Sequence, residues 1–200
     1  MERCSWCLGT EEMKRYHDEE WGVPLHDDQK QFEFICLEVL QCGLNWDMMI
    51  RKRQIFRRCF EGFDPARVAA YGEAEIERIL STEGMIRSRR KVEAIIGNAR
   101  CLLALQREHG SVSAWLWGLA GGAPILYAGH QRGGLPSQNG LSRRISAELK
   151  RRGFRYLGPV TVYSHLQACG VINDHAETCF CRGALLQRYP AVRRRRDAEG

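Results

Sequence analysis

Cysteine and histidine side chains that could bind a metal ion lie near both ends of this 200-residue chain. They are Cys4, Cys7 and His17 within the first 21 residues, and His175, Cys179 and Cys181 after residue 170. If His175 begins a helical turn, its imidazole and the Cys179 thiolate lie at i and i+4 on one face, where both could bind one tetrahedral zinc ion. Cys4 and His17 could supply two further ligands and join the two ends of the chain.

Spacing alone leaves the choice of ligands open. Cys4 and Cys7 form a Cys-x-x-Cys pair, and Cys181 lies close to Cys179. Buried thiols and surface histidines without a metal would give the same pattern. The nine cysteines are an odd number, and in a reducing compartment they favour core thiols, ligands or nucleophiles over a disulfide framework.

Glu38 is a carboxylate in an apolar sequence, between Phe34 and Cys42 on the expected helix. Such a group is costly to bury unless a polar or cationic partner meets it. Four aromatic residues could form the walls of a pocket for a flat ligand, with Glu38 accepting hydrogen bonds at its edge. They are Trp6, Tyr16, Trp21 and Trp46. The alternative to a ligand pocket is that Glu38 lies at the edge of the solvent and that the four aromatic residues are part of the hydrophobic core.

The elements that would position these side chains show helical periodicity. Asp28 and Gln31 form a capping box before a helix that Gly43 ends, and Asn45 can cap the next helix. Asp64, followed by Pro65, predicts a short helix ending near residue 72. Residues 142–152 and 158–170 predict two more helices. Alternation with a period of two is nearly absent, so we predict an all-α fold.

Residues 73–109 predict two helices joined by a tight turn that contains Gly84, with Ser88 capping the second helix. Met85, Ile86 and Arg87 follow the glycine, so turn amides and a cation could face a DNA phosphate, as in a helix-hairpin-helix element. Taken alone this signal is weak, because helical hairpins are also common packing units. The glycine-rich stretch 120–140 predicts a long irregular loop of the kind that is often functional.

Charge is distributed unevenly around a net value of +6. Residues 1–38 hold ten acidic and four basic side chains, whereas 39–60, 84–110 and 142–158 carry +4, +4 and +5. A basic face assembled from these three segments would suit a polyanionic partner, although solvated helix faces would give the same composition. The run Arg193 to Arg196 predicts a disordered basic tail over 188–200, to which we assign no function.

The chain length suits one globular domain or two small interleaved ones, and we place a single domain at residues 1–187. No apolar run approaches the length of a membrane span, and the first residues lack the layout of a signal peptide. We therefore expect a cytoplasmic protein without membrane association, acting as a monomer.

Several collinear motifs resemble the 3-methyladenine-DNA glycosylase I family of DNA repair enzymes. The similarity covers about residues 1–182 with its spacing intact. The motifs are Met1-Glu2-Arg3-Cys4-Ser5-Trp6, Tyr16-His17-Asp18-Glu19-Glu20-Trp21-Gly22-Val23-Pro24, Phe32-Glu33-Phe34-Ile35-Cys36-Leu37-Glu38, Gly43-Leu44-Asn45-Trp46, Phe63-Asp64-Pro65, Gly84-Met85-Ile86-Arg87, Ala94-Ile95-Ile96-Gly97-Asn98-Ala99, Lys150-Arg151-Arg152-Gly153-Phe154, Tyr163-Ser164, Gln167-Ala168-Cys169-Gly170 and Asn173-Asp174-His175. So many motifs in one order are highly specific.

The resemblance implies an all-helical enzyme of the helix-hairpin-helix glycosylase superfamily that flips 3-methyladenine out of alkylated double-stranded DNA. It implies one structural zinc bound by Cys4, His17, His175 and Cys179, which joins the segments 1–21 and 171–182. It implies that Glu38 is the pocket carboxylate, that Tyr16 and Trp46 stack on the base, and that Trp6 and Trp21 are further walls. Leu44 falls where the family places a side chain in the gap left by the flipped base.

The sequence departs from the family pattern at a few positions. Asn45 stands where serine is usual, Met13 where some relatives have tyrosine, and residues 118–140 match poorly. Most glycosylases of the superfamily have an aspartate shortly after the hairpin, but none occurs between Asp64 and Asp174. We therefore predict a glycosylase that hydrolyses labile cationic adducts with water as nucleophile and does not cleave the strand.

Two other classes of function remain as alternatives. A zinc-stabilised DNA-binding module would keep the hairpin and a vestigial pocket, which the presence of Glu38, Tyr16 and Trp46 argues against. A thiol oxidoreductase using Cys4 and Cys7 would need a βαβ pattern around that pair, and the sequence does not predict one.

Overall fold

The computed structural model describes residues 2–128 and 134–195. The first half of the chain forms two short 3₁₀ helices and five α-helices: η1 (Ser5–Cys7), α1 (Glu11–Glu19), α2 (Asp28–Gln41), α3 (Trp46–Cys59), η2 (Glu61–Phe63), α4 (Pro65–Ala69) and α5 (Glu73–Ser81). The second half forms α6 (Arg89–His109), α7 (Val112–Ala120), β1 (Ile125–Ala128), α8 (Gly140–Arg151), α9 (Pro159–Ala168), α10 (Phe180–Arg188) and β2 (Val192–Arg195). No helix of the described chain is long and apolar enough to cross a membrane.

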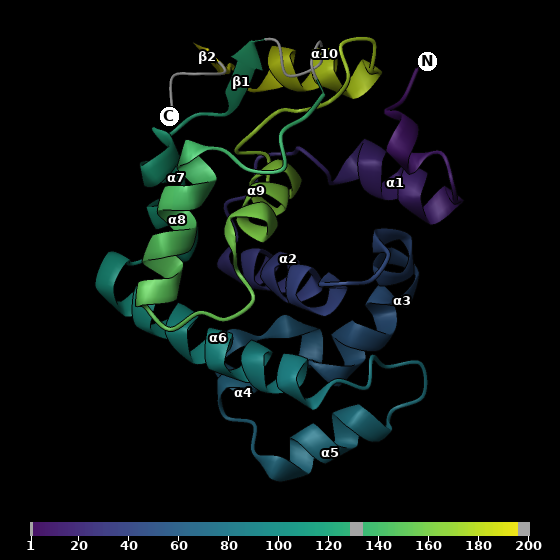
Figure 1. Ribbon diagram of the computed structural model, residues 1–200, viewed down its shortest axis with the longest axis vertical. Helices are drawn as coiled ribbons and strands as arrows, with labels where there is room; N and C mark the ends of the chain where they lie inside the picture. The colour runs from purple at the N-terminus through teal and green to yellow at the C-terminus, as the bar shows by residue number, and fades with distance from the viewer. Residues whose placement is uncertain (1, 129–133, 196–200) are drawn as a thin grey trace.

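Helix α2 lies at the centre of the molecule. Every one of its residues from 31 to 40 is buried, which is the pattern of a helix covered on all sides. Figure 1 shows α2 beside α9, with α1 and α3 on one side, α7 and α8 on the other, and α6, α4 and α5 toward one end. Glu38 therefore belongs to the most enclosed helix of the fold.

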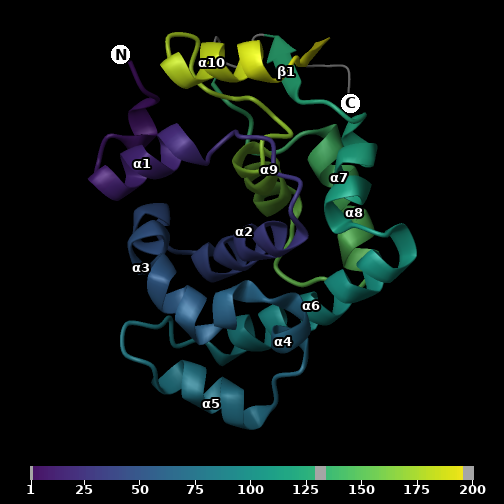
Figure 2. The same ribbon diagram turned by 180° about the vertical axis from the view of Figure 1, so that it is seen from behind.

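Helices α1 and α10, from the two ends of the described chain, lie at the end of the molecule opposite α5, as Figure 2 also shows. Here η1 and α1 approach the segment that precedes α10, and the backbone N–H of Phe180 donates to the carbonyl of Glu2 at 3.1 Å. The beginning of the described chain thus packs against the start of α10.

The prediction of an all-α fold needs one correction, because the structure is mostly helical but contains a small sheet. Strands β1 and β2 pair in parallel, with Ile125 opposite Val192 and Ala128 opposite Arg195. The first part of the predicted disordered tail is therefore ordered, and Arg194 also donates to the carbonyl of Ala120 at 2.7 Å. Residues 196–200 of the tail, and 129–133 of the predicted loop, lie outside the described residues.

The observed helix caps confirm two of the caps predicted from the sequence and correct a third. The Asn45 side chain accepts from the N–H of Asp47 at 2.7 Å, and Asp64 caps α4 before Pro65, as predicted. Asp27 rather than Asp28 caps α2. The Asp28 carboxylate instead accepts four hydrogen bonds from residues 106–113 and thereby anchors the start of α7 on α2.

Candidate functional site

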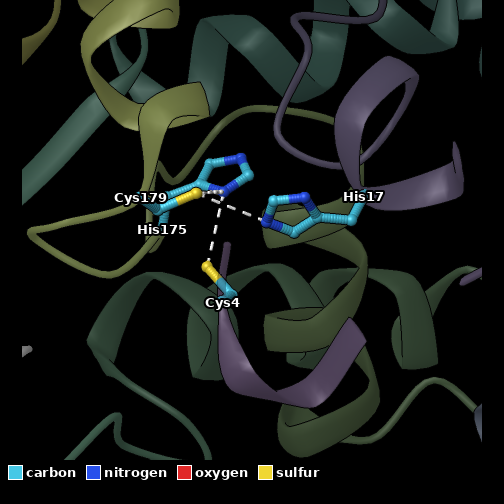
Figure 3. Close-up of side chains that lie close together, drawn as sticks. All are labelled: Cys4, His17, His175 and Cys179. Carbon is cyan, nitrogen blue, oxygen red and sulfur yellow. Dashed lines mark hydrogen bonds between the residues drawn. The ribbon is translucent and has the colours of Figure 1, made fainter. Parts of the chain in front are cut away.

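Four buried side chains from the two ends of the chain converge on one point, as Figure 3 shows. His17 comes from α1, Cys4 from the segment before η1, and His175 and Cys179 from the segment that leads into α10. Their potential ligand atoms all lie within 4.8 Å of one another. The structure thus brings together the four residues that the resemblance implies as metal ligands.

The spacing of these atoms suits a tetrahedral ion. Cys179 Sγ lies 3.5 Å from both His17 Nε2 and His175 Nδ1, and Cys4 Sγ lies 3.6 Å from His175 Nδ1. Metal–ligand distances of about 2.3 Å for zinc–sulfur and about 2.0 Å for zinc–nitrogen give a sulfur–nitrogen edge of about 3.5 Å in a tetrahedron. The donor set and its spacing therefore fit zinc.

Hydrogen bonds outside the cluster orient both imidazoles toward it. His17 Nδ1 lies 2.8 Å from Asp18 Oδ1, and the Asp18 carboxylate also accepts hydrogen bonds from Nε and Nη2 of Arg3. His175 Nε2 lies 3.1 Å from the carbonyl oxygen of Trp21. When these outer nitrogens donate, His17 Nε2 and His175 Nδ1 present their lone pairs to the centre, as metal-binding histidines require.

The other two nearby cysteines do not point to the centre of the cluster. Cys7 Sγ donates to the carbonyl of Cys4 at 3.1 Å. Cys181 Sγ lies 3.9 Å from His17 Nδ1, the ring nitrogen that faces Asp18. The expected helical turn from His175 to Cys179 is absent, because α10 begins only at Phe180 and the segment before it forms a tight turn. The two ligands meet through this turn instead.

Next to the cluster lies a cavity of about 280 Å³, into which the predicted pocket residues converge. Its lining includes Trp6, Tyr16, Trp21, Glu38, Gln41, Trp46, Ser164 and Gln167. The rings of Trp6 and Trp21 meet edge to face with centroids 4.9 Å apart, and those of Tyr16 and Trp46 lie 5.8 Å apart. Aromatic walls with a few polar groups are typical of a site for a flat organic ligand.

Two polar groups of this cavity are buried without a partner among the described residues. The Tyr16 hydroxyl has no hydrogen bond, although its residue is only 2% exposed. The Glu38 carboxylate has no donor within hydrogen-bond distance among those residues, and its residue is 4% exposed. Burial raises the pKa of Glu38 to about 8. Groups of this kind are normally satisfied, so their arrangement indicates a polar ligand or water in the cavity.

The turn between α2 and α3 carries Leu44 at the surface, with 37% of the residue exposed. The adjacent Asn45 caps α3 and so fixes Trp46 at the first position of that helix, where its side chain lines the cavity. Leu44 thus projects from the same turn that supplies a wall of the cavity.

The helical hairpin forms as predicted from α5, residues 82–88 and α6. The burial of its turn residues shows which of them could contact DNA. Met85 is 7% exposed, and its N–H already donates to the carbonyl of Thr82. Its side chain packs in the core, so Met85 does not face a ligand as we predicted. Ile86 is half-buried and Arg87 exposed, and neither amide has an acceptor within the described residues.

Sequence reasoning missed three polar residues of the cavity: Gln41, Ser164 and Gln167. The signal that could have found the last two is their i, i+3 spacing on α9, which places both on one face of the helix. Gln167 Nε2 donates to Asp174 Oδ2 at 2.9 Å, and the hydroxyl of Tyr163 donates to the same oxygen at 2.5 Å. A buried carboxylate therefore holds the Gln167 amide in place.

Comparison with known proteins shows the family of the chain. Residues 6–182 match the family model described as methyladenine glycosylase. DNA-3-methyladenine glycosylase 1 of Escherichia coli is 41% identical over 181 residues, which cover 90% of this chain and 97% of that enzyme.

Solved structures agree with the sequence match. A crystal structure of 3-methyladenine DNA glycosylase I superposes with a TM-score of 0.84 at 42% identity and covers 90% of this chain and 99% of that one. The enzyme from Staphylococcus aureus, solved to explain its recognition of 3-methyladenine, has a TM-score of 0.84 at 30% identity, over 90% of this chain and 96% of its own. The chain therefore belongs to the methyladenine glycosylase family, a family of enzymes that hydrolyse N-glycosyl bonds.

Proposed function

We propose that this enzyme releases 3-methyladenine from alkylated double-stranded DNA by hydrolysing the N-glycosidic bond of a base flipped into the cavity. The observation that carries the proposal is an aromatic cavity that contains the unpartnered hydroxyl of Tyr16 and the buried carboxyl of Glu38. Family membership supports the same substrate, because relatives are named for it. A base can reach such a pocket only after leaving the stack.

Recognition in this proposal depends on the charge of the lesion. An adenine nucleotide methylated at N3 is cationic, and its glycosidic bond is weakened. Stacking that cation against Tyr16 and Trp46 contributes roughly 0.5–2 kcal/mol beyond its apolar burial. Glu38 would accept hydrogen bonds from the base edge and oppose its charge, whereas Trp6 and Trp21 close the cavity.

The reaction itself is a hydrolysis. Water oxygen forms a bond to the sugar C1′, the bond from C1′ to the base nitrogen breaks, neutral 3-methyladenine leaves, and one proton passes to solvent. The described chain places no aspartate beside the hairpin, since none occurs between Asp64 and Asp174. The lability of the cationic adduct replaces that assistance, and without a covalent intermediate the DNA strand stays intact.

We propose that Cys4, His17, His175 and Cys179 bind one zinc ion. Four protein ligands leave no open position, so the ion would be structural and would lock α1 against the segment before α10. Tyr16 is adjacent to His17 in sequence, and the backbone carbonyl of Trp21 accepts a hydrogen bond from His175. The zinc site would therefore also hold Tyr16 and Trp21, two residues that line the cavity.

DNA binding in this proposal uses α5 and α6 as a helix-hairpin-helix element. The amides of Ile86 and Arg87 and the exposed Arg87 side chain would meet a phosphate, and Leu44 would fill the gap left by the flipped base. The exposed Arg51 on α3 and Arg151 on α8 lie in the basic segments and would add further contacts. We propose that the enzyme acts as a monomer on this duplex.

The test is to incubate the pure protein with duplex DNA treated with a methylating agent and to identify the released bases by chromatography. We expect 3-methyladenine to be released and the strands to stay intact until alkali is added. Glu38→Gln should abolish most of the release, and Glu12→Gln on the exposed face of α1 should not. Absence of released 3-methyladenine, or strand cleavage without alkali, would contradict the proposal.

A further inference from the structure

Lys91 is a buried lysine that the proposed chemistry does not use. It lies in the first turn of α6, the second helix of the hairpin, and only 9% of the residue is exposed. Its Nζ donates to the carbonyl of Leu40 at 2.6 Å and to that of Cys42 at 2.7 Å. These carbonyls are at the C-terminal end of α2, where backbone oxygens lack helical partners and a cation is favourable.

The turn that Lys91 holds connects two sides of the base cavity. Cys42 N–H donates to the carbonyl of Glu38 at 3.2 Å, so the turn begins on the residue that would oppose the lesion's charge. Gln41, which lines the cavity, donates from Nε2 to the carbonyl of Leu44 at 2.7 Å. The turn ends at Trp46, a cavity wall. The turn therefore carries Leu44 between the cavity residues Glu38 and Trp46, and its link to the hairpin sets where the cavity and Leu44 lie relative to the hairpin.

A second lysine makes the reciprocal contact from α3 to the hairpin turn. Lys52 Nζ donates to the carbonyl of Gly84 at 2.6 Å. Gly84 has a φ of +79°, and a Cβ built there would lie 2.7 Å from the Cδ1 atom of Ile55 on α3. The hairpin turn thus packs closely on α3, and a side chain at residue 84 would require Ile55 to move and a strained backbone conformation.

Both contacts join the same two parts of the molecule: the hairpin and the corner formed by α2 and α3. Burying an ammonium group is costly, and the described residues give Lys91 carbonyl partners but no carboxylate. An apolar side chain could fill the core here at lower cost. The selective advantage of lysine is then the directional link to two particular carbonyls.

We propose that Lys91 and Lys52 make the hairpin and the α2–α3 turn one rigid unit, so that a phosphate bound at the hairpin fixes where Leu44 and Trp46 meet the damaged nucleotide. Lys91 is in this view a positioning residue, because it touches neither base nor sugar. The inference rests on the proposed function, since it assumes that the hairpin binds DNA and the cavity binds the base.

The first experiment uses Lys91→Met, which keeps the length of the side chain and removes its hydrogen bonds. Single-turnover release of 3-methyladenine from methylated duplex should fall on the order of 100-fold, as expected for reacting groups displaced by about 1 Å. Affinity for free 3-methyladenine, measured by calorimetry, should stay within about twofold because the cavity walls remain. Lys14→Met on α1 removes one positive charge from an exposed ion pair with Glu11 and should leave both values unchanged.

Two results would overturn the inference. Release by Lys91→Met within about twofold of the wild type would show that the link has no role. A parallel loss of free-base affinity and release would show a general structural defect, not a positioning role. Wild-type protein that releases no 3-methyladenine would contradict the proposed function separately. In that case hydrogen exchange still tests whether Lys91 holds the α2–α3 turn. The backbone amides of Cys42 and Leu44 should exchange faster in Lys91→Met than in the wild type. Unchanged exchange rates would refute the inference.

Lys52→Met provides an independent variant whose half-buried side chain is removed with less risk to folding. It should also slow release and leave free-base affinity unchanged. Because both lysines connect the same pair of elements, the double variant should lose about as much rate as the more impaired single variant. Losses that multiply would mean that the two lysines act separately and would refute the single rigid unit.

Discussion

Replacing Glu38 by glutamine should stabilise the free protein at alkaline pH while removing most of its activity. Burial raises the pKa of this carboxyl from its ordinary 4.5 to about 8 in the folded protein. Between these two values the folded state holds a proton that the unfolded state has lost. The contribution of Glu38 to stability therefore falls as the pH rises from 4.5 to 8 and is constant above and below that window.

The size of the effect follows from the two pKa values. Each pH unit inside the window costs about 1.4 kcal/mol, so the ionised carboxylate is about 5 kcal/mol less favourable here than in water. Between pH 6 and 8.5 the wild type should lose about 2.5 kcal/mol of unfolding free energy through this group alone. Glutamine does not titrate, so the variant should lose none of it.

Urea unfolding of both proteins at pH 6 and pH 8.5 measures this difference, and titrations shared by the two proteins cancel. The same samples should show that Glu38→Gln binds a cationic base more weakly than the wild type, while a neutral analogue of the same shape loses less. Equal pH dependence of stability in the two proteins would refute the argument from burial. Equal losses for both ligands would show that shape, not charge, governs binding.

Three further predictions concern the metal, the DNA and the fold. Cys4→Ser should lose the bound zinc and Cys7→Ser should keep it, because the Cys7 thiol faces a backbone carbonyl; metal analysis showing the reverse would refute our ligand set. Arg87→Ala should lower the slope of log affinity for duplex against log salt by about 0.9, and an unchanged slope would remove it from the interface. Asp28→Ala should cost about 3 kcal/mol in urea unfolding because four donors lose their acceptor, against about 1 kcal/mol for Asp27→Ala, and equal costs would contradict this. Although burial opposes its ionisation, these hydrogen bonds lower the pKa of Asp28, so its contribution should disappear as the pH falls below 3.8.

The sequence predicts the helices well where the determinants are local. Asn45 and Asp64 cap their helices through backbone amides two or three residues away, and such contacts are encoded in neighbouring residues. The central position of α2 is also visible in its sequence, because apolar residues follow on all its faces. These features depend on short-range periodicity and capping, which a single sequence contains.

Features that depend on distant residues are not predicted. Asp28 is of a residue type that often caps helices, yet its carboxylate accepts hydrogen bonds from backbone amides more than 80 residues away. Val192 is followed in β2 by three arginines without alternation, and residues 192–195 form a strand only because the carbonyl of Pro124 and the edge of β1 offer partners. Met85 follows a turn glycine like an exposed residue, but it is buried in the hydrophobic core with only 7% of the residue exposed. In each case the packing of the whole chain overrides the local pattern.

The candidate site shows the same division. Glu38 is conspicuous in sequence because a charged residue interrupts a largely apolar helix, and the proposed metal ligands stand out by residue type. Gln167 and Lys91 are ordinary polar residues on helices, and their roles appear only with their partners. Gln167 needs Asp174, seven residues away, and Lys91 needs carbonyls about 50 residues away.

The burial of Glu38 explains how one pocket could prefer a damaged base without an elaborate pattern of hydrogen bonds. At neutral pH the empty cavity holds a mostly protonated carboxyl, since its pKa is about 8. A neutral adenine does not compensate for ionising this carboxyl, which costs about 1.4 kcal/mol at pH 7 when the pKa is about 8. A cationic base does, through Coulombic attraction that is strong where water is excluded. Under the proposed function the charge of the lesion would offset the cost of the buried carboxylate. This difference, added to the weaker glycosidic bond, would take the place of a dedicated catalytic aspartate.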